Sequence, residues 1–302
     1  MTRSKRHAWP KAERQISGRT RVVGIFGDPV EHSLSPAMHN AAFAALGLDF
    51  VYVPFRVNAE ALREATRAIR ALDLVGVSVT VPHKEQILPL LDFCSPLARR
   101  VGAVNTVVNR GGQLWGDNTD VHGVVSALRE ARFRVRGKRA VVVGAGGAAR
   151  AVIAALLEER VGEIIVVNRT PDRARALARR FRTASVPIHV SDPSVLQSPE
   201  HLRGVGLVAN TTSLGLAGER FFPMQPASTP PTCLFFDLVY GRETDFLQQA
   251  ARAGRRTLDG LPMLLRQGAR AFELWTGRTA PLAVMREALQ KALDHQRAHT
   301  TS

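Results

Sequence analysis

The stretch Val141–Arg150, VVVGAGGAAR, decides the fold of this 302-residue chain. Its three valines form a short apolar run, as expected for a strand that is buried on both faces. Gly144, Gly146 and Gly147 interrupt the run, and AARAVIAALLEE restores apolar residues at helical spacing. A strand, a glycine turn and a helix in this order bind a pyrophosphate, because N–H groups at the helix N-terminus meet its charge. The pattern G-x-G-x-x-A, with Ala149 last, predicts a dinucleotide site, although an ordinary strand-to-helix turn can carry it too.

The residues after the next apolar run distinguish NADP from NAD. Asn168, Arg169 and Thr170 follow the apolar run 164–167, about 20 residues past the glycines. An NAD site has an acidic residue at this point. Asn168 is neutral, and Arg169 and Arg173 offer guanidinium groups that can hold a 2′-phosphate through two hydrogen bonds. The alternative is that these arginines are simply solvated, but the pattern favours NADP over NAD.

The composition is that of an ordinary globular chain, with 45% hydrophobic and 22% charged residues. No apolar run approaches the roughly 20 residues of a membrane span, and the N-terminus lacks the apolar core of a signal peptide. The two cysteines, Cys94 and Cys233, lie in apolar segments, which argues against a disulfide framework or a cysteine-ligated zinc. We therefore expect a cytoplasmic protein with no membrane partner.

The net charge of +15 is partly concentrated at the N-terminus, where residues 1–21 carry seven basic residues and one acidic residue. A basic tail can bind nucleic acid or anionic lipid, but this one lacks periodicity and has Trp9 as its one aromatic residue. We expect residues 1–20 to be a disordered basic tail. The other charges are spread along the chain, which favours attraction for anionic ligands over a nucleic-acid partner.

Two segments place polar side chains at the ends of predicted elements. In EHSLSPAMHN, Pro36 suits the first turn of a helix and Ser35 suits its N-cap, so Ser33 and Ser35 lie where an anion binds favourably. The alternative is that Ser35 only caps its own helix. In GVSVTVPHK, a strand that stops at Pro82 brings Lys84 to the carboxyl end of the sheet, where α/β folds keep their sites.

Lysine is scarce in this chain, with five lysines among 41 basic residues. Because lysine can exchange a proton and arginine cannot, Lys84 is a candidate acid–base residue, the alternative being a surface lysine that starts a helix. Gly102–Val108 is predicted to be a strand that carries the polar Asn105. Asp120 follows in the first turn of the next helix, where it either complements the helix dipole or shares a site with Lys84.

Strands and helices alternate after the glycine turn, which predicts a doubly wound parallel sheet. Its further strands are expected near residues 164–167, 186–190, 206–210 and 233–238. Two helices are expected at the C-terminus, one starting at 259–262 and one running from Pro281 to about His295. Thr211 follows a strand and can line the path of the cofactor.

Eight separated motifs occur in one order: HSLSPAMHN, VTVPHK, GAVNT, GDNTD, GAGGAAR, NRT, DLVY and DGLPMLLRQGA. From about residue 21 to 292 the chain therefore resembles the shikimate dehydrogenases. The resemblance implies a two-domain α/β enzyme that reduces 3-dehydroshikimate to shikimate with NADPH, on the route to chorismate and the aromatic amino acids. It implies a substrate domain at 21–119, a Rossmann-type NADP domain at 120–259, and C-terminal helices at 260–302 that pack back on the first domain.

The resemblance also implies a role for each matching residue. Lys84 and Asp120 are expected to be the catalytic pair, and Ser33 and Ser35 are expected to bind the substrate carboxylate. The other expected substrate contacts are Thr80, Asn105, Tyr240 and Gln267. The expected cofactor contacts are Gly144, Ala145, Gly146, Gly147, Ala148, Asn168, Arg169, Thr170, Arg173, Thr211 and Gly260. No metal-ligand spacing is present, so a lysine and a carboxylate are expected to stabilise charge and exchange protons without a metal.

Three positions depart from the family pattern: Ser78 replaces the usual asparagine, GRETDFL lacks a proline, and the basic tail is extra. Ser78 leaves a dual quinate/shikimate dehydrogenase as an alternative. A methylene-tetrahydrofolate dehydrogenase is disfavoured by the Ser33/Ser35 anion site, and a non-catalytic ligand-sensing relative by retention of Lys84 and Asp120. We expect a monomer or a homodimer.

Overall fold

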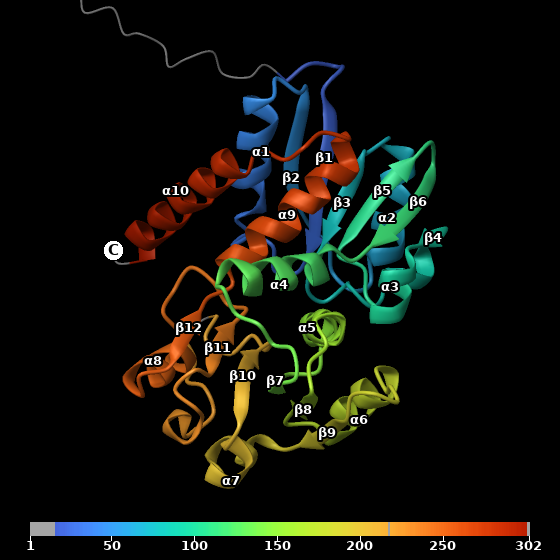
Figure 1. The fold of residues 1–302 in the computed structure, drawn as a ribbon. Helices are drawn as coiled ribbons and strands as arrows, with labels where there is room; N and C mark the ends of the chain where they lie inside the picture. The colour runs from blue at the N-terminus through green and yellow to red at the C-terminus, as the bar shows by residue number, and fades with distance from the viewer. Residues whose placement is uncertain (1–15, 217, 301–302) are drawn as a thin grey trace, which may run out of the picture.

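A computed structural model describes residues 16–216 and 218–300, and it folds into two α/β domains, each built on a six-stranded sheet (Figure 1). Most of the predicted disordered tail, residues 1–15, lies outside the described residues. At its end, Ser17–Thr20 form a turn in which Thr20 Oγ1 donates to Asp49 Oδ1 at 2.8 Å. Residues 17–20 of the predicted tail are therefore structured.

The first domain contains a mixed sheet with the strand order β2-β1-β3-β5-β6-β4. Its strands are β1 (Arg21–Gly27), β2 (Phe50–Arg56), β3 (Gly76–Val79), β4 (Phe93–Cys94), β5 (Thr106–Arg110) and β6 (Gln113–Asp117). β1 runs parallel to β2 and β3, whereas β5 is antiparallel to both β3 and β6. The predicted strand Gly102–Val108 is wrong at its start, because the backbone at Val104 bonds to Lys84 O instead of a neighbouring strand.

Helices cover both faces of this first sheet. They are α1 (Ser35–Ala45), α2 (Leu62–Ala71), α3 (Pro96–Val101), α9 (Leu261–Thr276) and α10 (Leu282–Thr300), with a short 3-10 helix at Leu88–Leu90. The C-terminal pair α9 and α10 returns to the first domain and packs beside α1 (Figure 1), as predicted. Trp275 of α9 anchors this return, because its Nε1 donates to Val107 O of β5 at 3.0 Å.

The second domain contains the predicted doubly wound parallel sheet, with the strand order β12-β11-β10-β7-β8-β9. Its strands are β7 (Arg139–Val143), β8 (Glu163–Val167), β9 (Ile188–Ser191), β10 (Val205–Asn210), β11 (Leu234–Asp237) and β12 (Arg256–Leu258). Its helices are α5 (Gly147–Glu158), α6 (Pro171–Arg180), α7 (Pro199–Leu202) and α8 (Asp245–Arg252), with 3-10 helices at Pro193–Gln197 and Pro226–Ser228. The strand order changes direction between β7 and β10, which is where such sheets bind nucleotides.

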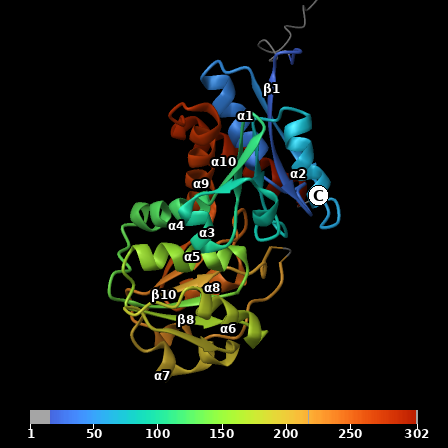
Figure 2. The same ribbon diagram turned by 90° about the vertical axis from the view of Figure 1, so that its right-hand side faces the viewer.

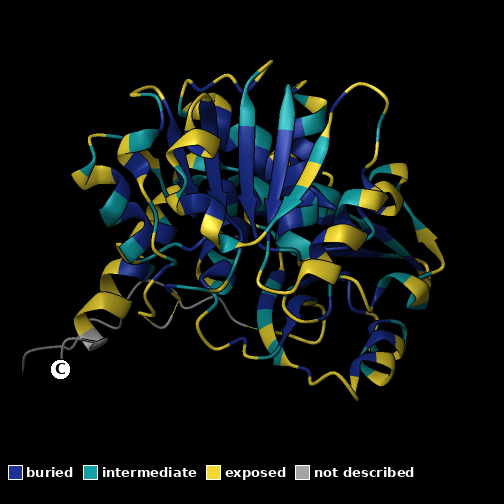
Figure 3. Cartoon of the chain, turned by 90° about the horizontal axis from the view of Figure 1, so that it is seen from below, coloured by how far each residue is buried: buried dark blue, intermediate teal, exposed yellow. Residues whose placement is uncertain are grey.

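The hydrophobic cores lie between the sheets and the helices that cover them. The central strands are buried, and the outer faces of the helices are exposed (Figure 3). The edge strand β12 was not predicted, because Arg256 and Thr257 are exposed and its sequence carries little apolar signal.

The helix α4 (Thr119–Glu130) joins the two domains. It packs against α9 on one side and α5 on the other, and the two views agree on this arrangement (Figures 1 and 2). A Cβ at Gly123 would lie 2.8 Å from Met263 O, so this glycine permits the close approach of α4 and α9. The start of α4 therefore lies at the boundary between the first and second domains.

Candidate active site

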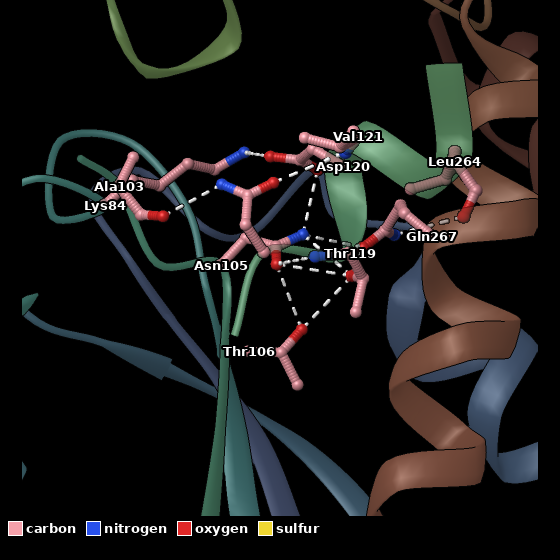
Figure 4. Close-up of polar contacts among 10 residues, drawn as sticks. Lys84, Ala103, Asn105, Thr106, Thr119, Asp120, Val121, Leu264 and Gln267 are labelled. Carbon is pink, nitrogen blue, oxygen red and sulfur yellow. Dashed lines mark hydrogen bonds and ion pairs between the residues drawn. The ribbon is translucent and has the colours of Figure 1, made fainter. Parts of the chain in front are cut away.

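Lys84 lies on a turn that is fixed by hydrogen bonds to two other segments of the first domain. His83 Nε2 donates to Val57 O at 2.6 Å, and Val104 N donates to Lys84 O at 2.7 Å. These bonds leave the Lys84 side chain, 18% exposed, to point at the first turn of α4. Its Nζ lies 2.6 Å from Asp120 Oδ2 (Figure 4).

Asp120 is 6% exposed at its side chain, and both of its carboxylate oxygens have partners. Oδ2 pairs with Lys84, and Oδ1 accepts a hydrogen bond from Asn105 Nδ2 at 2.9 Å (Figure 4). Because a buried carboxylate needs both a counter-charge and hydrogen bonds, this arrangement satisfies both oxygens of Asp120. Asp120 therefore shares a site with Lys84 and does more than complement the helix dipole.

Asn105 organises the other polar groups around this pair (Figure 4). Its Oδ1 accepts from Thr119 N at 2.7 Å, and its Nδ2 also donates to Thr119 Oγ1 at 2.9 Å and Gln267 Oε1 at 3.3 Å. Thr106 Oγ1 adds a bond to Asn105 Oδ1 at 3.1 Å. The structure thus brings together four predicted site residues: Lys84, Asn105, Asp120 and Gln267. Sequence reasoning did not single out Thr106 and Thr119, although the GAVNT and GDNTD motifs contain them.

Ser33 and Ser35 lie together at the N-terminus of α1, but not as predicted. Ser35 is the first helical residue and Leu34 occupies the N-cap position without a side-chain bond, so the predicted Ser35 cap is wrong. Instead, Ser33 Oγ accepts a hydrogen bond from Ser35 N at 3.3 Å. The Ser35 hydroxyl is therefore not committed to capping its own helix, which removes the alternative that sequence reasoning had left open.

Thr80 and Tyr240 each follow a strand, in two other loops. Thr80 follows β3, and a Cβ at Gly27 would lie 2.4 Å from its Cγ2, so Thr80 is held at the end of β1. Tyr240 follows β11, and burial raises the pKa of its hydroxyl. The preceding Asp237 anchors this loop, since it accepts from Asn210 Nδ2 at 2.9 Å, Val239 N at 3.0 Å and Thr244 Oγ1 at 2.5 Å.

The glycine turn lies directly against the lysine. A Cβ at Gly147 would lie 3.4 Å from both Cβ and Cδ of Lys84. Gly144 has a φ of +118°, and a Cβ there would lie 2.4 Å from Thr211 Oγ1, so this position requires glycine. Gly146 occupies the N-cap of α5 and faces open space. The N-terminus of α5 is thus accessible to a phosphate group beside Lys84.

The NRT segment lies at the far side of the turn, after β8. Asn168 Nδ2 donates to Thr170 O at 2.8 Å, which shapes the loop. Arg169 and Arg173 are exposed, and within residues 16–216 and 218–300 neither guanidinium pairs with a carboxylate. Gly260 is placed differently from the other predicted cofactor residues, because it is buried and its N–H donates to Val239 O at 3.1 Å.

Two arginines of the second domain reach the first domain near this site, which the sequence did not predict. Arg150 Nη2 lies 2.6 Å from Glu85 Oε2, and Glu85 is adjacent to Lys84 in the chain. Arg180 donates to the carbonyl oxygens of Arg99, Arg100 and Val101 at the end of α3, at 2.5, 3.1 and 3.0 Å. These contacts hold the dinucleotide turn against the Lys84 segment.

The described residues contain no group of three or more His, Cys, Asp or Glu side chains arranged to hold a metal ion. The same residues include no helix with the length and apolar character needed to cross a membrane.

Comparison with known proteins agrees with this arrangement along the chain. Residues 25–107 match the shikimate dehydrogenase substrate binding domain, residues 127–198 match shikimate/quinate 5-dehydrogenase, and residues 260–290 match the shikimate 5′-dehydrogenase C-terminal domain. The shikimate dehydrogenase (NADP(+)) of Desulforamulus reducens is 47% identical over 290 residues, covering 92% of this chain and 97% of that protein. This chain belongs to the shikimate dehydrogenase family.

Solved structures of the family share its fold. The shikimate 5-dehydrogenase of Thermus thermophilus, in complex with NADP(H) and shikimate, is 40% identical with a TM-score of 0.80, covering 90% of this chain and 99% of that chain. The shikimate dehydrogenase of Aquifex aeolicus is 38% identical with a TM-score of 0.82, covering 91% and 99%. The predicted family and the predicted two-domain fold are confirmed.

Proposed function

We propose that this chain catalyses the NADP-dependent interconversion of shikimate and 3-dehydroshikimate, as a step towards chorismate and the aromatic amino acids. The observation that carries the proposal is the Lys84–Asp120 pair at 2.6 Å, which lies against Gly147 of the dinucleotide turn. An acid–base pair beside a dinucleotide site is what reduction of a carbonyl requires. The names and bound ligands of the relatives described above support the same reaction.

The residues present fit NADP. The open N-terminus of α5 at Gly146 suits the pyrophosphate, and the exposed Arg169 and Arg173 suit a 2′-phosphate because guanidinium groups bind phosphate through paired hydrogen bonds. The contact residues proposed for NADP are Gly144, Ala145, Gly146, Gly147, Ala148, Asn168, Arg169, Thr170, Arg173, Thr211 and Gly260. When bound, the nicotinamide supplies or accepts the hydride.

Lys84 and Asp120 handle the proton that accompanies the hydride. In the direction of reduction, the Lys84 ammonium stabilises negative charge as it develops on the carbonyl oxygen, and Nζ then donates a proton to that oxygen. In the direction of oxidation, Lys84 Nζ accepts the proton from the hydroxyl. Asp120 holds Nζ in place, and Asn105 holds Asp120 through Oδ1.

The substrate is proposed to lie with its carboxylate at Ser33 and Ser35, because the N-terminus of the 11-residue helix α1 favours an anion. Its ring hydroxyls are then within the polar group formed by Lys84, Asn105, Asp120 and Gln267. Thr80 and Tyr240 complete the proposed substrate contacts. We also propose a cytoplasmic enzyme, in which the free thiols Cys94 and Cys233 stay reduced, acting as a monomer or a homodimer.

The test is to follow NADPH absorbance with purified protein, NADP+ and either shikimate or quinate. Quinate has an extra hydroxyl at C1, and a buried hydroxyl without a partner costs about 1–3 kcal/mol. We therefore expect roughly 10- to 100-fold higher kcat/KM for shikimate. Comparable values for both acids would favour a dual quinate/shikimate dehydrogenase, and no turnover of either acid would refute the proposed function.

A further inference from the structure

Tyr52 on β2 carries a polar group that the reaction scheme above does not use. The residue is 1% exposed, and its hydroxyl oxygen is buried without a hydrogen-bond partner in the part of the chain that the structure describes. Leaving a buried hydroxyl unpaired costs about 1–3 kcal/mol, and buried polar groups in native proteins nearly always have a partner. A phenylalanine would fill the same space without that cost, so the hydroxyl calls for an explanation.

The sheet register places Tyr52 on the same side of the sheet as Ser78. Tyr52 pairs with Val23 of β1, while Ser78 of β3 pairs with Ile25 of the same strand, so both residues face the same side of the sheet. α1 covers that side, since its His39 stacks on the Tyr52 ring at a centroid distance of 4.5 Å.

Two hydroxyl side chains lie next to Tyr52 on this side. Burial raises the pKa of Tyr52, and the neighbouring side chains of Ser78 and Ser35 lower it. Ser35 is 5% exposed and Ser78 is 9% exposed, so three buried hydroxyl groups meet beneath the N-terminus of α1. Tyr240, another proposed substrate contact, packs against the same apolar cluster that contains Tyr52.

We propose that Tyr52 is a positioning residue for the substrate carboxylate and that it acts through Ser35. On substrate binding, the Tyr52 hydroxyl donates a hydrogen bond to Ser35 Oγ, and the single proton of Ser35 is directed to a carboxylate oxygen. A serine hydroxyl has one proton and two lone pairs, so accepting from Tyr52 does not compete with donating to the substrate. Each bond in such a chain polarises the next.

Ser78 is a second polar neighbour of the Tyr52 hydroxyl, beside Ser35. This inference rests on the proposed function, because it needs an acidic substrate at Ser33 and Ser35.

The test is the Tyr52→Phe variant of the full-length chain, with shikimate as the probe. We expect the Kd and KM for shikimate to rise about five- to tenfold, as for the loss of one hydrogen bond in a charge-assisted chain. We expect kcat and the KM for NADP+ to change less than twofold. The melting temperature of the ligand-free variant is expected to equal or exceed that of the wild type, since the ring packing on His39 is kept and an unpaired hydroxyl is removed.

A double-mutant cycle separates this role from a structural one. In a Ser35→Ala background, Tyr52→Phe is expected to change the Kd less than twofold, whereas in a Ser78→Ala background its full effect should persist. An unchanged Kd in Tyr52→Phe, or a full effect retained on Ser35→Ala, would overturn the inference and leave the proposed function intact. Absence of shikimate oxidation by the wild type would instead remove the proposed function and, with it, this inference.

Discussion

His39 offers a prediction whose sign and size both follow from the structure. It lies on α1 at 1% exposure, stacked on Tyr52 and set edge-on to Trp275 at 5.3 Å. Neither ring nitrogen has a hydrogen-bond partner among residues 16–216 and 218–300. Burial lowers the pKa of His39 from 6.5 to about 3, and no charged group contributes to that change.

The direction of the pH effect follows from proton linkage. Between pH 6.5 and about 3 the unfolded chain binds a proton at His39 and the folded chain does not, so stability falls as the pH falls. The full difference corresponds to about 5 kcal/mol, of which about 2 kcal/mol is lost between pH 7 and pH 5.

Asp237 in the second domain acts in the opposite direction. Burial raises the pKa of its carboxyl from 3.8 to about 6, so the folded state binds the proton more tightly and stability falls as the pH rises through this range. From pH 7 to pH 5 this group adds about 1 kcal/mol of stability. Asp237 therefore offsets about half of the His39 contribution in the wild type.

The perturbation is His39→Phe, which keeps an aromatic ring against Tyr52 and removes the titrating group. Urea unfolding followed by circular dichroism would give the free energy of unfolding at pH 7 and pH 5. Relative to the wild type, the variant is expected to gain about 2 kcal/mol on going to pH 5, because all other titrating groups are shared.

Two further variants control this measurement. The matched control is His201→Gln, which replaces an exposed histidine instead of a buried one. Asp237→Asn should make the protein lose more stability in acid than the wild type does. Equal pH dependence in the wild type and His39→Phe, within about 0.5 kcal/mol, would refute the reasoning.

Three further predictions concern the active site. Lys84→Ala should lower kcat by roughly 10² or more in the NADP+/shikimate assay, and Lys84→Arg should restore little, because the charge remains but proton exchange does not; recovery of most activity with arginine would limit Lys84 to an electrostatic role. NADP+ should be preferred over NAD+ by at least about tenfold in kcat/KM, and Arg169→Asp should erode or reverse that ratio, whereas equal use of both cofactors by the wild type would contradict it. Glu85→Gln, which breaks the ion pair with Arg150, should lower kcat/KM about two- to fivefold, whereas Glu159→Gln, which breaks a pair at the opposite end of α5, should not; an equal effect of both would argue against a role in placing Lys84.

Local patterns in the sequence determined much of the architecture. The run of valines, the glycines and the helical spacing at 141–159 predict a parallel strand, a phosphate-binding turn and α5, because each depends on residues within a few positions of one another. The same holds for the alternating strands and helices that follow and for the Pro-initiated C-terminal helices. The candidate site residues came from motifs, and the role of each was implied by family resemblance.

Tertiary structure alone decided which of these side chains meet. Lys84 and Asp120 are 36 residues apart and Asn105 and Gln267 are 162 apart, so no local pattern relates them. Val104 bonds to the Lys84 loop, so β5 begins at Thr106 and not at Gly102. Similarly, α1 begins at Ser35, so Ser35 is a helical residue and Leu34 occupies the N-cap position. The unpartnered hydroxyl of Tyr52 is likewise invisible in the sequence, because hydrogen-bond satisfaction depends on which atoms the folded chain brings within bonding distance.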